Sequence, residues 1–71
     1  MEDYQKRMLE EREELSGRIE RLSDFIDSAR DGEVDVSDEH YDMMLAQVYA
    51  MHAYKSALDL RIADLGIDAD D

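Results

Sequence analysis

Two basic residues, Arg12 and Lys55, stand where the surrounding spacing calls for apolar side chains. Arg12 interrupts an apolar pattern over residues 8–29, and Lys55 interrupts another over residues 41–65. If two antiparallel helices are joined near residue 33, residues whose numbers add up to about 67 lie level with each other. Arg12 and Lys55 are then level, and two like charges inside a seam require compensating anions.

A bound ligand is one source of that compensation. Guanidinium and ammonium groups bind phosphate, and aromatic rings stack on bases. The pattern therefore suggests an anion or nucleotide pocket, for which the candidate ligand-binding residues are Arg12, Lys55, Tyr54, Tyr49 and His52.

The same two charges also have purely structural explanations. They can pair with Glu11, Glu13 or Asp59, or with acids of a second subunit, or they can fix the register of the helices. Long basic side chains can also reach solvent from a seam position. Because such arrangements are common, the pattern favours a structural role, and the pocket stands beside it as a hypothesis.

Other constellations give weaker signals. Acidic and hydroxyl side chains follow the ligand spacing of a calcium-binding loop over residues 31–42, but Val36 replaces the required glycine and Asp42 the bidentate glutamate, so no metal site is predicted. His40 and His52 lack carboxylate or histidine partners at helical spacing. With no phosphate-binding glycine loop and no nucleophile motif, we expect neither a cofactor nor an enzyme.

The elements that position these residues are two helices. The first is predicted over about 3–30, the link over 31–37, the second helix over about 38–65, and an acidic tail over 66–71, all in one domain. Gly32 suits the left-handed position after a helix, Ser37 suits an N-cap, and Gly66 suits a second helix stop, followed by Ile67 packing on Ile62. The fold class is an all-α, antiparallel two-helix hairpin.

The second helix has more apolar surface than one neighbour can cover. Ala46, Ala50, Ala53 and Ala57 form a further stripe of small residues. A core of this size rarely suffices alone, and the chain has no Cys to add disulfides. We therefore expect a dimeric or higher helical bundle. Its predicted interface comprises Tyr41, Met44, Leu45, Val48, Ala50, Met51, Ala53, Ala57, Leu58, Ile62 and Leu65.

Charge and hydropathy exclude some partners. The net charge is −12, and residues 31–71 carry 11 acids against 2 bases. Such a surface disfavours binding to duplex nucleic acid and favours basic partners. No apolar run is long enough to cross a membrane, and the first residues lack the apolar core of a signal peptide.

Three short motifs run along the two predicted helices: an opening Y-Q-x-R, a run ending in L-x-x-F-I, and a later Q-x-x-A-M-x-x-Y-x-x-x-L-x-x-R-I. Their residues are Tyr4, Gln5, Arg7, Leu22, Phe25, Ile26, Gln47, Ala50, Met51, Tyr54, Leu58, Arg61 and Ile62. With these motifs the chain resembles a family of small helical phage and prophage proteins of unassigned role, related to a gene product of a crAss-like phage. The linking segment DGEVDVSDEH departs from the more apolar, Glu-rich segment of that family. The resemblance implies a viral or prophage origin and a bacterial cytoplasm, and it transfers no catalytic residues.

Small size, the phage resemblance and the missing catalytic set together suggest a non-enzymatic binding protein. The function we expect is counter-defence, in which a host immune component is neutralised by sequestering a nucleotide signal or by binding a defence protein. The alternative is a structural or assembly adaptor that binds a partner helix.

Overall fold

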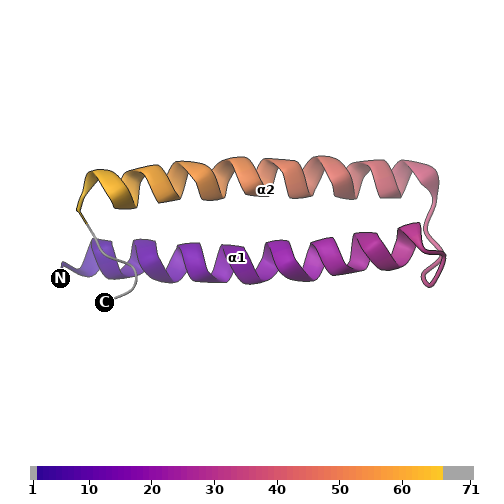
Figure 1. Cartoon of the computed structure of the whole chain (residues 1–71), viewed down its shortest axis with the longest axis horizontal. Coiled ribbons are helices and arrows are strands. Elements are labelled where there is room, and N and C mark those ends of the chain that lie inside the picture. The colour runs from indigo at the N-terminus through magenta and orange to yellow at the C-terminus, as the bar shows by residue number, and fades with distance from the viewer. Residues whose placement is uncertain (1, 67–71) are drawn as a thin grey trace.

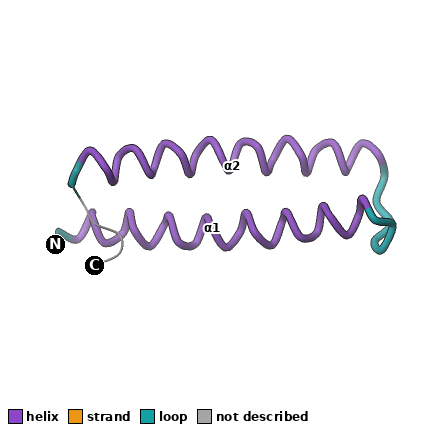
Figure 2. Tube along the Cα trace, in the orientation of Figure 1, coloured by secondary structure: helices purple, strands orange, loops and turns teal. Residues whose placement is uncertain are grey.

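The chain folds into two antiparallel helices that lie side by side (Figure 1). The computed structural model describes residues 2–66, in which α1 comprises Asp3–Arg30 and α2 comprises Asp38–Asp64. The tube drawing shows helix and loop as the only conformations in that range (Figure 2). The all-α hairpin is therefore confirmed, and α2 ends one residue earlier than predicted, with Leu65 as its C-cap. Neither helix is apolar over a stretch that could cross a membrane.

The connection is fixed by caps at both of its ends. Gly32 has φ of +80°, and the backbone N–H of Glu33 donates to the carbonyl of Ser28 at 2.9 Å, as in a Schellman motif. At the start of α2, the Ser37 hydroxyl accepts from the backbone N–H of His40 at 3.1 Å. Gly66, with φ of +70°, follows α2. The predicted roles of all three residues are confirmed, whereas the predicted Ile67 contact and the tail from 67 onward lie outside the described residues.

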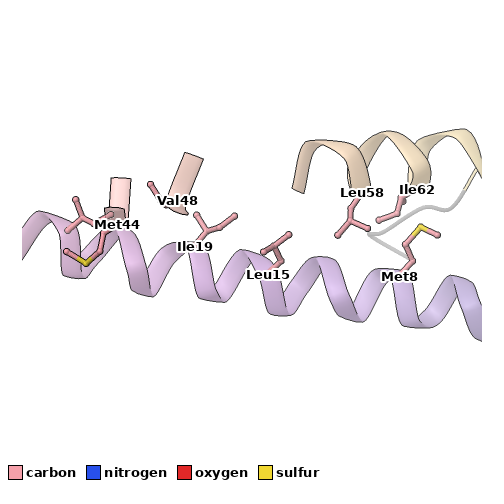
Figure 3. Close-up of a cluster of buried hydrophobic side chains, with 8 residues drawn as sticks. Met8, Leu15, Ile19, Met44, Val48, Leu58 and Ile62 are labelled. Carbon is pink, nitrogen blue, oxygen red and sulfur yellow. The ribbon is translucent and has the colours of Figure 1, made fainter. Parts of the chain in front are cut away.

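The core is a single seam between the helices (Figure 3). Leu58 and Ile62 lie near Met8 at one end, and Val48 lies near Ile19 further along. A single seam leaves most of each helix surface in water, and the hairpin is accordingly long and thin, at 45 × 17 × 15 Å. The buried residues are Met8, Leu15, Ile19 and Ile26 from α1 and Met44, Val48, Leu58 and Ile62 from α2.

Candidate functional site

The seam is interrupted where Arg12 and Lys55 replace apolar residues. On α1 the buried positions pass from Met8 to Leu15, and on α2 they pass from Val48 to Leu58. Between them the Arg12 and Lys55 side chains are 37% and 31% exposed. Both stems therefore lie partly within the seam, while both charged groups remain accessible to water.

Asp59 compensates the two cations. Its Oδ1 accepts from Nε of Arg12 at 2.5 Å, and its Oδ2 lies 3.4 Å from Nζ of Lys55. Partial burial raises the pKa of Asp59, but the hydrogen bond and charge of Arg12, joined by those of Lys55, outweigh it and hold the pKa below its ordinary 3.8. The carboxylate is thus shared between two helices, and the group of three side chains keeps one net positive charge.

A shallow groove opens beside this group. Arg12, Ser16 and Glu13 from α1 and Lys55 from α2 line it, with Leu9 at its apolar side. The Ser16 hydroxyl donates to the backbone carbonyl of Arg12 at 2.9 Å. Within residues 2–66, Nε is the only guanidinium nitrogen of Arg12 that has a protein acceptor. The two terminal nitrogens are therefore available to a ligand, and an anion is the ligand that they suit.

The aromatic candidates do not join Arg12 and Lys55 in the hairpin. The Tyr54 hydroxyl donates to Oε1 of Glu11. Because successive helix residues point about 100° apart, Glu11 and Tyr54 lie on the opposite edge of the seam from their neighbours Arg12 and Lys55. Tyr49 and His52 are exposed on α2 and do not line the groove. The structure brings together Arg12 and Lys55 from the predicted set and separates them from the three possible stacking residues.

The predicted interface residues divide into two groups. Met44, Val48, Leu58 and Ile62 are buried against α1 within one chain, and Tyr41, Leu45 and Met51 pack partly against the same core. The remaining four, Ala50, Ala53, Ala57 and Leu65, are exposed. Most of the apolar pattern in α2 therefore serves the hairpin itself, and a smaller set is left for another contact.

Two further features carry less chemistry. A depression along α1 is lined by Gly17, Arg18 and Arg21 together with three glutamates, so it lacks a second wall and a uniform charge. Over residues 2–66, no three acidic or histidine side chains gather closely enough to hold a metal ion, and this includes the link with calcium-loop spacing.

Sequence reasoning gave Asp59 only as one of several possible partners, and it did not identify Ser16 or Leu9 as groove residues. The i,i+4 spacing of Lys55 and Asp59 was a usable signal, because residues four apart share one side of a helix. No pattern in the sequence marks Ser16 or Leu9, since their place in the groove depends on how α1 is rotated against α2.

The fold and the groove together define a small two-helix protein with an exposed cationic cluster bridging its helices. The family model of Sequestin matches residues 2–64, so the chain belongs to the Sequestin family. Searches among curated proteins and among solved structures found no match.

Proposed function

We propose that this protein is a non-enzymatic binding protein that sequesters an anionic ligand of the nucleotide class in the groove beside Arg12 and Lys55. The biological role we propose is counter-defence: a phage or prophage protein acts in the bacterial cytoplasm and removes a nucleotide immune signal of the host. The family name Sequestin suggests sequestration and supports a non-enzymatic binding function.

The observation that carries the proposal is the pair of cations built into the seam. Apolar residues at positions 12 and 55 would continue the core, so the two basic residues give up apolar contacts there. Asp59 neutralises only one of the two charges. In a chain of net charge −12, Arg12, Lys55 and Asp59 together still carry one positive charge, and the free N–H donors of Arg12 are the groups in the groove to which an anion can bind.

Two carboxylates oppose the binding of an anion in the groove. A phosphate must compete with Asp59 for Arg12 and Lys55, and Glu13 lines the same groove with a negative charge. Arg12 can serve both acceptors, because its guanidinium offers five N–H donors in a fixed fork. The ligand therefore adds to the existing ion pair through the terminal guanidinium nitrogens.

A defence protein is the second form of target, and one feature favours it. Residues 24–42 at the link end carry eight acids and a single base, Arg30. Such a tip attracts a basic protein surface and speeds its association at low salt. If the target is a defence protein, a basic host protein should be pulled down with this chain, and salt should weaken the pull-down. Neutralising the acidic residues of the link end should abolish it; these are Asp35, Asp38, Glu39 and Asp42.

A structural or assembly adaptor remains the alternative function. The observation in its favour is the exposed apolar side of α2, where Met43, Tyr49 and Leu60 face water. Such a helix side can bind a partner helix. An adaptor predicts co-purification with a structural protein of the phage and no response to nucleotides.

The deciding experiment is a thermal-melting screen against cyclic di- and trinucleotides and ADP-ribose derivatives. A ligand that binds only the folded state, present at 100 times its Kd, adds about 2.7 kcal/mol to the free energy of unfolding. In a domain of this size each kcal/mol raises Tm by about 4–8 °C. We therefore expect one nucleotide class to raise Tm by more than about 10 °C.

The chain offers a matched control, because Lys6 and Lys55 are its two lysines. Lys55→Gln is expected to abolish the ligand-induced shift while the helical circular dichroism spectrum persists, and Lys6→Gln is expected to leave the shift unchanged. Arg12→Gln and the exposed Arg18→Gln form a second matched pair. A flat screen with the wild type, or equal loss in both lysine variants, would contradict the groove as the binding site.

A further inference from the structure

The side of α2 that faces away from α1 carries a second apolar seam. Its members follow each other in steps of 3, 4, 3, 4 and 3, the spacing of helices that pack lengthwise. Its two terminal residues, Met43 and Leu60, are 66% and 73% exposed, and residues 43–54 contain no Asp, Glu, Lys or Arg. We call this set the outer seam: Met43, Ala46, Ala50, Ala53, Ala57 and Leu60.

The outer seam has the same order of residue sizes in both directions along the helix. A large residue at each end encloses four alanines, and the centre falls midway between Ala50 and Ala53. If a second copy lies antiparallel about that centre, Met43 is level with its Leu60, Ala46 with its Ala57, and Ala50 with its Ala53. A two-fold axis requires a surface of this self-complementary kind, since each patch must contact its own image.

We propose that the outer seam pairs with the outer seam of a second copy in antiparallel orientation, giving a dimer in which the two α2 helices are central. The alanines allow the two backbones to approach closely, and Met43 and Leu60 fill both ends of the contact. The four helices of the dimer then form one layered bundle, in which each α2 is covered on two opposite sides.

The distribution of charge selects the antiparallel orientation. Residues 24–42, at the link end, carry eight acids and one base, whereas the sequence segments 1–12 and 55–71, which contain the two chain ends, carry nine acids and five bases. Parallel pairing would place the two acidic link ends together. Antiparallel pairing places each link end beside the less acidic end of the other copy, which reduces the repulsion between like charges.

The accessible area of the chain is large for its mass. The whole chain exposes 5339 Å², whereas a compact monomer of 8.3 kDa exposes about 4,600 Å². The excess, roughly 700 Å², is close to the ~800 Å² that each partner buries in a stable interface of standard size. The thin hairpin therefore exposes more surface than a compact fold, by about the area that one partner buries in a dimer.

The dimer leaves the groove beside Arg12 and Lys55 open. Lys55 points toward α1, on the opposite side of α2 from Ala53 and Ala57. Each dimer accordingly presents two separate grooves. Because pairing and groove use different sides of α2, the pairing does not depend on the proposed ligand, and the two claims can fail separately.

Sedimentation equilibrium at about 50 μM tests the pairing, with Ala53→Glu as the interface variant and Ala63→Glu as its match. Both add one carboxylate to an exposed alanine of α2, but Ala63 lies outside the outer seam. We expect twice 8.3 kDa for the wild type and for Ala63→Glu, and 8.3 kDa with retained helicity for Ala53→Glu. A monomeric wild type would overturn the dimer even if nucleotides bind, and a dimer with a flat nucleotide screen would overturn only the function.

Disulfide trapping tests the orientation, because the chain has no cysteine of its own. Ala46→Cys and Ala57→Cys proteins are prepared singly, mixed, unfolded, refolded and oxidised. The antiparallel pairing predicts that the mixture forms the 46–57 heterodimer and that neither protein links to itself, since like positions lie about 16 Å apart along the helix. Rapid self-linking of Ala46→Cys would overturn the antiparallel orientation and indicate parallel pairing. A dimer that stays intact in Ala53→Glu would place the contact elsewhere and overturn the proposal. A monomeric wild type whose outer seam binds a partner helix would overturn it as well.

Discussion

At the scale of single residues, Asp59 decides the electrostatics of the groove. It accepts a hydrogen bond from Arg12 across the seam, and it forms an ion pair with Lys55, which lies one turn earlier in α2. Without it, two like charges would lie partly buried beside each other, an arrangement that costs free energy. Under the proposed function, the same carboxylate competes with the anionic ligand for Arg12 and Lys55, so stability and binding would place opposite demands on one residue.

The ion pairs of Asp59 are expected to weaken in acid. The pKa of Asp59 is lowered in the folded protein, so its ion pairs contribute to stability above the ordinary pKa of 3.8, and the contribution is lost as pH falls through the lowered value. Asp59→Asn is therefore expected to lower Tm at pH 7. The difference in Tm from the wild type is expected to close below about pH 3.8, as the wild-type carboxyl becomes protonated.

Asp24→Asn is the control for the general relief of repulsion in a chain of net charge −12. Asp24 is exposed on α1, and it has no ion pair among those between residues 2 and 66. Both variants remove one negative charge, so the difference between their melting curves isolates the ion pairs of Asp59. Identical pH dependence in the two variants would contradict the bridging role.

At the scale of the helices, α1 and α2 differ in how many of their own sides must be covered by a neighbouring helix. α1 has one apolar side, and its remaining surface is mostly charged with Tyr4 and Phe25 as isolated exposed aromatic residues, whereas α2 has apolar residues on two opposite sides. A helix that is apolar on two sides needs two neighbours. This difference explains why a continuous apolar side is left exposed on α2 and not on α1.

Gly17 gives a prediction about α1. A methyl group there would meet Nη1 of Arg21 at 3.3 Å, the flexible end of a side chain that can swing aside, and it would meet no atom of α2. Gly17→Ala is thus expected to stabilise the protein by about 1 kcal/mol, because alanine loses less backbone entropy in a helix. Calorimetry should show a rise of about 4–8 °C in Tm.

Gly32→Ala is the opposing control for that measurement. Its φ of +80° lies in the left-handed region, where a side chain costs about 1–2 kcal/mol, although a methyl group there has no neighbour within 4 Å. It is expected to lower Tm. Destabilisation by Gly17→Ala would instead show that the α1 surface at Gly17 is closely packed in the assembled protein.

At the scale of the whole molecule, stability rests on one thin seam. Leu58 is 1% exposed and is the most completely buried side chain of the hairpin. Leu58→Ala is expected to cost about 2–5 kcal/mol, and a core of this size supplies only about 3–5 kcal/mol. Circular dichroism at 25 °C should therefore show a largely unfolded chain.

Leu65→Ala removes the same atoms from a leucine that is 39% exposed and is expected to leave the protein folded. If Leu58→Ala remained fully helical with an unchanged Tm, contacts between copies, and not the hairpin seam, would be the main source of stability.

The sequence by itself determined the local structure. Apolar spacing gave the two helices, and Gly32, Ser37 and Gly66 marked their ends, because capping depends on the conformational preferences of single residues and their neighbours. It also placed Arg12 level with Lys55, since a short link between two helices leaves only one antiparallel register.

Only the tertiary structure decided which side chains meet across that register. The rotation of α1 against α2 about their own axes sets these contacts, and periodicity does not fix that angle to within one residue. This rotation brings Arg12 into contact with Asp59 and Tyr54 into contact with Glu11, at opposite edges of the seam. The cations are therefore separated from the aromatic residues with which sequence reasoning had grouped them. It also decided which apolar residues of α2 were consumed by the hairpin and which, from Met43 to Leu60, were left facing water, because burial depends on both helices at once.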